Sequence, residues 1–320
     1  MVLDGVDKLL RRYPDSPVIE DLLGTLDAGE IRARVRELEP DTAEIFYFAA
    51  SVGALFGVRR RDGSRVAIKV NKLFTDERYF AEVQQLQAKL ADAGYPAPRP
   101  VGRVGTVTID EWLDDGEYRN AHEPDVRRAM ARELVRFHGL ATETGLRPRR
   151  AFLRPEGALW PKPHNALFDF EATAAGAEWI DEIATASRAI TDTGVGAELV
   201  GHTDWSAKHL RFSAQLELMA LYDWDSVTTD LEPSLVGTAA GSFTYTEELG
   251  DDVDVWPSAA ESQAFIAEYE EQRGEPFDED ERAATRAACV YLRAYAARCH
   301  HAFEGDARES GLADFAAALL

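Results

Sequence analysis

Two groups of residues carry side chains that could act on a phosphate group. The first is Val66-Ala67-Ile68-Lys69, where alternation along an extended strand turns Ala67 and Lys69 to the same face. A lysine held there could pair with phosphate, whereas a lysine at a strand end more commonly lies on a solvated edge. The helix expected next carries Glu82 within reach of the lysine ammonium, and Glu77, nearer the helix start, is a less suitable partner.

The second group follows a glycine at position 201 and continues through an expected hairpin, with strands at 210–212 and 216–222. Its chemistry-bearing residues are His202, Asp204, His209, Asp223 and Asp225. Acidic side chains therefore stand at both ends of one hairpin. Phosphoryl transfer needs a carboxylate near the attacking hydroxyl and further ligands for the metal on the phosphates, and one hairpin can position both.

The elements that must position these residues follow from changes of periodicity. A helical segment at 18–38, divided near Gly24 and Gly29, precedes expected strands at 44–50, 55–60 and 65–71, with Asp62-Gly63 as a hairpin turn. The apolar spacing predicts a helix over 75–93, and a strand pair follows at 101–109. The polar segment 111–116 predicts a hinge.

Beyond the hinge, helices dominate. Ser258 and Glu261 form a capping-box pattern, and a long helix is expected over 279–303. The sequence therefore predicts an α+β fold with two lobes: a small antiparallel β-rich lobe at 1–110, the hinge at 111–116, and a larger, mainly helical lobe at 117–320. Such an arrangement favours a ligand cleft between the lobes.

Composition narrows the class of protein. The chain has 320 residues, 45% of them hydrophobic, and a formal net charge of −22, so a nucleic-acid partner is disfavoured. Cys289 and Cys299 are too few for a disulfide framework and are expected to be buried helix residues in a reducing compartment. No signal peptide or membrane span is evident. These features predict a cytoplasmic location, with no membrane partner and no indication of an oligomeric state.

The order of these motifs, from about residue 44 to the last helix, resembles the aminoglycoside phosphotransferase and choline kinase family, whose fold is similar to that of protein kinases. The resemblance implies that Asp204 is the catalytic base or orients the acceptor hydroxyl, and that Asp223 binds Mg²⁺ between the terminal phosphates of ATP. It also implies that Lys69, held by Glu82, contacts the α- and β-phosphates.

The resemblance further implies a nucleotide site whose remaining residues are Ala67, Ser51 and Gly53 of the phosphate loop, and Glu111 and Leu113 facing adenine. Two departures stand out. His209 replaces the metal-binding Asn of the family pattern, and imidazole is a poorer ligand for Mg²⁺ than an oxygen donor, so Mn²⁺ is an alternative metal. The phosphate loop at 51–57 has only two glycines.

Residues that could contact the acceptor are less clearly marked. They are Trp205 and Asp225, beside the catalytic motifs, and Glu247 and Glu248, which open an acidic run that could attract an aminated substrate. Core packing for the tryptophan and a solvated loop for the acidic run are the simpler interpretations. The sequence thus predicts an ATP-dependent transfer of phosphate to a hydroxyl of a small polar molecule, aminated molecules such as an aminoglycoside or a choline-like compound included.

Two other functions remain open from the sequence. His202, Asp204 and His209 are legitimate zinc ligand types and could activate a hydrolytic water. That hypothesis leaves Lys69 and Glu82 unexplained. A catalytically silent nucleotide-binding protein of the same fold is the other alternative, motivated by His209 and the glycine-poor loop.

Overall fold

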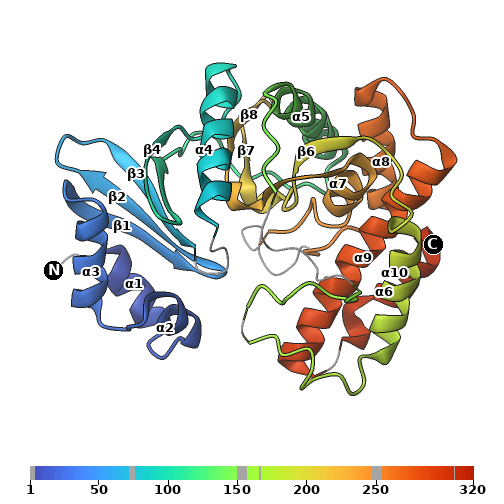
Figure 1. Cartoon of the computed structure of the whole chain (residues 1–320), viewed down its shortest axis with the longest axis horizontal. Helices are drawn as coiled ribbons and strands as arrows, with labels where there is room; N and C mark the ends of the chain where they lie inside the picture. Colours follow the sequence, from blue (N-terminus) through green and yellow to red (C-terminus); the bar gives the residue numbers. More distant parts are fainter. Residues whose placement is uncertain (1–3, 72–75, 150–156, 166, 247–253, 306) are drawn as a thin grey trace. The chain divides into compact units, whose positions relative to one another are not determined.

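The computed structural model describes residues 4–71, 76–149, 157–165, 167–246, 254–305 and 307–320, and the chain divides into two compact units (Figure 1). The first unit comprises Met1–Ala91 and Pro98–Asp114, and the second comprises Asp92–Ala97 and Asp115–Leu320. The division after Asp114 lies inside the segment expected to be a hinge. The short return of the chain at 92–97 to the second unit was not expected from the sequence.

The first unit contains one antiparallel sheet with strand order β1-β2-β3-β5-β4. Its strands are β1 (Thr42–Ala50), β2 (Gly53–Arg60), β3 (Arg65–Asn71), β4 (Pro100–Val104) and β5 (Val107–Glu111). Its helices are α1 (Gly5–Arg12), α2 (Pro17–Leu23), α3 (Ala28–Leu38) and α4 (Glu77–Asp92). Helix α1, begun by an Asp4 cap, was not predicted. Gly24, with φ 71°, ends α2 as expected. Gly29 lies within the first turn of α3 and does not interrupt that helix.

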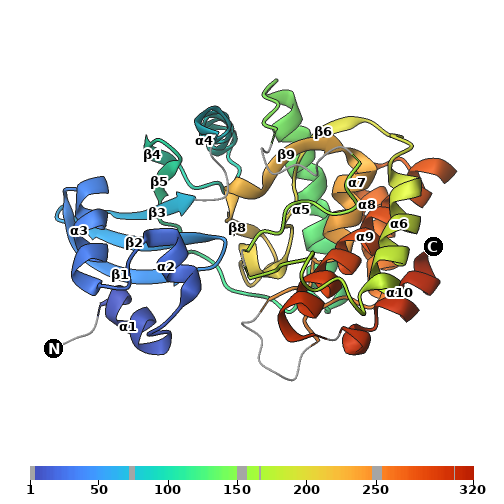
Figure 2. The ribbon, with the colours of Figure 1, turned by 60° about the horizontal axis from the view of Figure 1, so that its bottom comes forward.

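The two faces of this sheet have different partners. Ile68, Phe56 and Ile109 point to one face and join the apolar core formed with α1, α2 and α3. Ala67 and Lys69 alternate with these residues and therefore point to the other face, toward which Gln84 of α4 reaches. Figures 1 and 2 show α1–α3 and α4 on opposite sides of the sheet. The three N-terminal helices thus do not cover the face of the sheet that carries Lys69, and α4 lies on that face.

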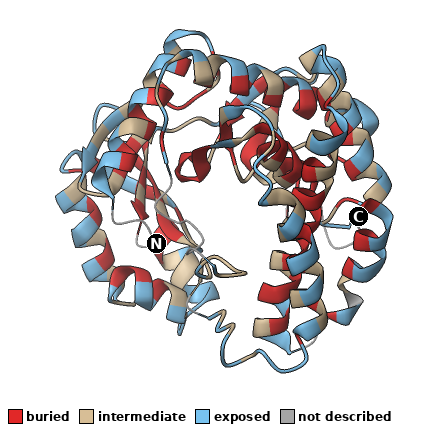
Figure 3. Ribbon diagram, turned by 45° about the vertical axis from the view of Figure 1, so that its right-hand side comes forward, coloured by how far each residue is buried: buried red, intermediate tan, exposed pale blue. Residues whose placement is uncertain are grey.

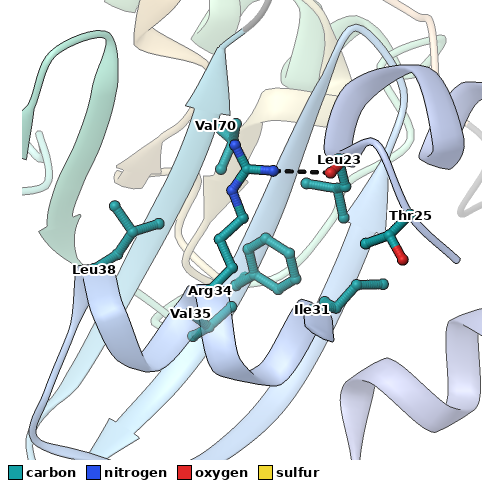
Figure 4. A pocket seen from close by; sticks show the side chains of 8 residues that line it. Leu23, Thr25, Ile31, Arg34, Val35, Leu38 and Val70 are labelled. Carbon is teal, nitrogen blue, oxygen red and sulfur yellow. Dashed lines mark hydrogen bonds between the residues drawn. The ribbon is translucent and has the colours of Figure 1, made fainter. Parts of the chain in front are cut away.

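A small apolar cavity remains where α2 and α3 pack on the sheet (Figure 4). Its volume is about 10 Å³, and Ile31, Phe56 and Val70 are among its lining residues. Arg34 lies over it and donates a hydrogen bond to the Leu23 carbonyl oxygen at 2.8 Å. A space of this size, lined by apolar surface, holds no more than one water molecule and is a packing defect rather than a ligand site.

The second unit is mainly helical, with two short antiparallel strand pairs. Its helices are α5 (Pro124–Glu143), α6 (Glu178–Thr191), α7 (Glu232–Ala240), α8 (Ala259–Arg273), α9 (Glu279–Glu304) and α10 (Leu312–Leu319). Its strands are β6 (Glu198–His202), β7 (Leu210–Phe212), β8 (Leu218–Leu221) and β9 (Val227–Leu231), with β6 paired to β9 and β7 to β8. Three single 3₁₀ turns, Ala207–His209, Trp224–Ser226 and Arg308–Ser310, complete it.

Several boundaries test the sequence reasoning directly. The capping box of Ser258 and Glu261 is confirmed, and Asp278 caps α9 in the same way. Strand β8 begins at Leu218 rather than at 216, because Leu216 has a φ of 60° and belongs to the turn. The pairing of β6 with β9 was not predicted.

Close packing of α7 against α9 forms the centre of the second unit. A Cβ atom at Gly237 would lie 2.2 Å from the carbonyl oxygen of Thr285, so only glycine allows this approach. Most residues of α7 are buried and none is exposed, and the exposed residues of α9 lie only near its two ends (Figure 3). Cys289 and Cys299 are both buried on α9, as expected, and burial raises the pKa of each thiol to about 12.

In the described part of the chain, every helix is too short or too polar to cross a lipid bilayer.

Candidate active site

The loop after β6 and the loop after β8 are fastened together by backbone hydrogen bonds. The backbone N–H and the hydroxyl of Thr203 both donate to the Ser226 carbonyl oxygen at 2.9 Å. The N–H of Tyr222 donates to the His209 carbonyl oxygen, also at 2.9 Å. The pairing of β6 with β9 brings His202 opposite Val227 and so places these two loops side by side.

Three of the residues singled out in the sequence meet in these loops: Asp204, His209 and Asp223. Each offers a ligand atom, and these atoms all lie within 4.8 Å of one another. His209 Nε2 lies 2.9 Å from Asp204 Oδ2, and the hydroxyl of Ser206 donates to Asp204 Oδ1 at 3.2 Å. The hydroxyl of Ser226 donates to Asp223 Oδ2 at 2.9 Å. The three groups are therefore oriented by their neighbours toward a shared centre.

Electrostatics make His209 and Asp204 an ion pair. Burial opposes charge on both, but the carboxylates of Asp204 and Asp223 outweigh it and raise the pKa of His209. Burial likewise raises the pKa of Asp204, and the charge and hydrogen bond of His209 more than offset it, leaving that pKa below its usual range. The Asp204 side chain is 43% exposed, whereas that of His209 is 11% exposed. A solvent-accessible carboxylate thus contacts a buried imidazole and favours its protonated form.

His202 has a positioning role. Its Nδ1 accepts a hydrogen bond from the backbone N–H of Asp204 at 3.2 Å, so its Nε2 is the protonated nitrogen and donates to the Tyr222 carbonyl oxygen at 3.0 Å. Burial lowers the pKa of His202 to about 4, which keeps the ring neutral. Both ring nitrogens are engaged, so the structure does not offer His202 to the zinc site of His202, Asp204 and His209 suggested from the sequence. Asp223, not His202, completes the group.

The backbone at Asp223 is in the left-handed region, with φ 64° and ψ 47°. Few residues other than glycine adopt it, although Asp and Asn tolerate it best. The turn into the 3₁₀ segment Trp224–Ser226 requires this conformation, which turns the Asp223 carboxylate toward Asp204 and His209. Such strain is often retained at functional positions.

The residues expected to contact an acceptor are placed differently. Trp205 is completely buried against Phe137, and Asp225 is 8% exposed. Core packing, the simpler interpretation for Trp205, is thus confirmed, and neither side chain is accessible to an acceptor molecule. Glu247 and Glu248 lie outside the described residues.

In the first unit, Lys69 lies over the turn that joins β1 to β2. A Cβ atom at Gly53 would meet Lys69 Cε at 3.5 Å and the Val70 carbonyl oxygen at 2.8 Å, so glycine is required for this approach. The turn is tight: the Ser51 N–H donates to the Gly53 carbonyl oxygen at 3.0 Å. Ser51 is exposed and Ala67 is half-buried. The expected phosphate loop is therefore a short hairpin rather than a long glycine-rich loop.

The remaining expected nucleotide contacts lie on β5 and α4. Glu111 ends β5 and is exposed, and Leu113 follows it. Glu82 is half-buried on α4, and its ion pair with Lys69 stays a prediction. Trp112 lies within the segment 111–113 expected to face adenine, and its ring packs against Phe46 at a centroid distance of 4.9 Å, over Gly57. A glycine within an otherwise apolar strand was the available signal for that close approach.

Comparisons with known proteins identify the family and the fold of the chain. The model of the phosphotransferase enzyme family matches residues 51–231, more than half of the chain. No curated protein matches the sequence. Among solved structures, the amicoumacin kinase hAmiN in complex with AMP-PNP, Ca²⁺ and Ami is similar, with a TM-score of 0.62 and 13% identity over 91% of this chain and 95% of that one.

Two other solved structures show the same fold. Plasmodium vivax ethanolamine kinase has a TM-score of 0.54 and 12% identity over 100% of this chain and 97% of that one. Choline kinase from Cryptosporidium parvum has a TM-score of 0.51 and 13% identity over 92% and 94%. The protein-kinase-like α+β fold expected from the sequence is thus confirmed. The matched segment runs from the β1–β2 turn to the end of β9 and includes both groups of chemistry-bearing residues. The chain therefore belongs to the phosphotransferase enzyme family.

Proposed function

We propose that the protein transfers the γ-phosphate of ATP to a hydroxyl group of a small polar acceptor, aminated acceptors included. The observation that carries this proposal is the convergence of Asp204, His209 and Asp223 within 4.8 Å. A carboxylate beside two further metal-ligand groups is what phosphoryl transfer to an alcohol requires. Membership of the phosphotransferase family and the kinase-like fold support the same reaction class.

Asp204 is the group that orients the acceptor hydroxyl. His209 holds Oδ2 and Ser206 holds Oδ1, while the backbone N–H of Asp204 is tied to His202. The carboxylate is therefore fixed in direction yet accessible. Because its pKa is low, it accepts the hydroxyl proton only as the bond to phosphorus forms, which suits a loose transition state.

The donor set fits a divalent metal ion. Asp223 and His209 would hold it, and carboxylate oxygen together with imidazole nitrogen suits Mn²⁺ at least as well as Mg²⁺. When bound, such an ion neutralises charge that develops on the transferring phosphate. His209 must first give up its proton, because only neutral imidazole can be a ligand. Lys69, from the first unit, is proposed to neutralise the α- and β-phosphates.

A screen of ATP consumption against pooled hydroxylated metabolites and aminoglycosides tests the proposal. We expect at least one pool to stimulate ADP formation in the wild-type protein and not in the Asp204→Asn variant. ATP binding with no turnover in any pool would favour the silent nucleotide-binding alternative. Equal stimulation of both proteins would remove Asp204 from its role.

A further inference from the structure

One half-buried carboxyl in the first unit has no part in the function described so far. Asp110 lies on β5, directly opposite Ala67 of β3, and Thr108 lies opposite Lys69. Directly paired residues of antiparallel strands point to the same face. Asp110 therefore stands on the lysine face of the sheet, one step along the strands from Lys69.

Neighbouring side chains hold this carboxyl in place. Gln84 of α4 donates from Nε2 to Asp110 Oδ1 at 3.1 Å and to the Gly102 carbonyl oxygen at 3.0 Å. The side chain of Thr108 also hydrogen-bonds to Asp110. Gln84 is 8% exposed and Asp110 is half-buried, so this network is partly shielded from solvent. It connects the helix, the edge strand and the strand next to Lys69.

The elements around Asp110 bring few charges to it. From β3 comes the ammonium group of Lys69, which interacts with it electrostatically. From α4 come Gln84, which is uncharged, and half-buried Glu82, the predicted partner of Lys69. On β4, Arg103 is exposed and donates instead to the Gly105 carbonyl oxygen at 2.6 Å.

We propose that Asp110 is a positioning residue for Lys69. Its carboxylate balances the lysine charge while the nucleotide site is empty, and it takes up a proton from solvent when a nucleotide phosphate binds the lysine ammonium group. The proposal rests on the proposed function, because it needs Lys69 to meet a nucleotide phosphate. The covalent change is confined to Asp110, whose carboxylate oxygen gains a proton that the buffer loses. Lys69 keeps its own proton and exchanges one anionic partner for another.

Burial explains why Asp110 takes up a proton rather than releasing one. Burial raises the pKa of Asp110 to about 6, while the hydrogen bonds from Gln84 and Thr108 and the charge of Lys69 act in the opposite sense. When phosphate neutralises the ammonium group, the lowering by Lys69 weakens and the pKa of Asp110 rises further. More Asp110 is then protonated near neutral pH. Nucleotide binding should therefore be linked to uptake of a fraction of one proton.

Calorimetry of ADP binding with Mg²⁺ at pH 6.5, in two buffers of different ionisation enthalpy, measures that uptake. We expect the wild-type protein to take up more protons per ADP than the Asp110→Asn variant, because asparagine keeps the hydrogen-bond acceptor and cannot titrate. Protons exchanged by ADP itself are the same in both. Asp41→Asn is the matched control, since Asp41 is exposed at the start of β1, and it should behave as wild type.

The outcomes separate this inference from the proposed function. Equal proton uptake by wild type and Asp110→Asn, both binding ADP, overturns the role of Asp110 and leaves nucleotide binding intact. Absence of ADP binding to the wild-type protein overturns both the role of Asp110 and the proposed function. If Asp110→Asn does not fold, infrared difference spectra of the wild-type protein on ADP binding decide instead. A gain of a protonated carboxyl band supports the proposal, and its absence contradicts it.

Discussion

The imidazole of His209 donates a hydrogen bond to Asp204 Oδ2 across 2.9 Å. The hydrogen on His209 Nε2 is thus shared with the carboxylate proposed to orient the acceptor. The same nitrogen cannot hold that proton and a metal ion, so metal binding competes with this ion pair. His209 links metal dependence to the position of Asp204.

Replacing His209 with asparagine should remove this competition and supply an amide oxygen, which Mg²⁺ prefers. We expect the Mg²⁺ concentration for half-maximal activity to fall by about tenfold, the size of one charge-assisted hydrogen bond. The preference for Mn²⁺ over Mg²⁺ should weaken as well. Metal titrations of ATP turnover measure both effects. His300→Asn, an exposed position on α9, is the control, and identical titrations for His209→Asn and wild type would show that position 209 is not a ligand.

Replacing Asp204 with asparagine should lower kcat by roughly 10²–10⁴-fold, the usual contribution of a positioned acid–base group. Affinity for ATP should change little, because Asp204 is proposed to contact the acceptor rather than the nucleotide. Steady-state kinetics combined with direct nucleotide binding check the two parts separately. Asp125→Asn, at an exposed carboxyl on α5, should leave both unchanged. Undiminished turnover in Asp204→Asn would contradict the assignment.

Local signals explain why much of the fold was predictable. Asp62-Gly63 marks a hairpin, and the apolar spacing of Phe80, Val83 and Leu90 marks α4, whose structure spans Glu77–Asp92. The β6–β9 pair was missed because it joins residues about thirty positions apart through two short strands that contain Gly201 and Thr228. Such pairing depends on the tertiary structure and leaves little local pattern.

The candidate site was likewise predictable in part. Motif order placed Asp204, His209 and Asp223 in one site, and the structure brings their ligand atoms together. Sequence could not show that His209 pairs with Asp204, because that contact depends on side-chain direction after the 3₁₀ turn. Core packing, the simpler interpretation for Trp205, is confirmed by its complete burial, although a single aromatic residue in a loop has no periodicity to indicate its side.

The contact between α7 and α9 gives a prediction about stability. Gly237→Ala places a methyl group against the backbone of Thr285, which cannot move aside as a flexible side chain could. We expect a loss of about 1–3 kcal/mol in the free energy of unfolding. Gly139→Ala is the matched control, because Gly139 is exposed on α5 with nothing near its Cβ position. That variant should gain roughly 0.5–1 kcal/mol from helix propensity. Urea denaturation compares the two, and equal effects would contradict the packing argument.

Two buried histidines should make the folded state sensitive to acid. Burial lowers the pKa of His138 to about 3 and that of His202 to about 4. The unfolded chain, with ordinary histidine pKa values near 6.5, binds more protons than the folded chain between pH 6.5 and about 4. Stability is therefore full above pH 6.5 and falls as pH drops, by up to about 1.4 kcal/mol per pH unit for each histidine.

His138→Asn tests this linkage independently of the catalytic loops. The Tyr269 hydroxyl donates to Glu232 at 2.7 Å, so its oxygen accepts from His138 Nδ1 at 2.9 Å, and losing that contact should lower stability at pH 7.5. The further loss on going from pH 6.5 to pH 5 should nevertheless be smaller than in wild type, because one buried group no longer titrates. Urea denaturation at several pH values measures both. The exposed His300→Asn variant should keep most of the wild-type slope, and an unchanged slope in His138→Asn would mean that the buried imidazole is not what resists protonation.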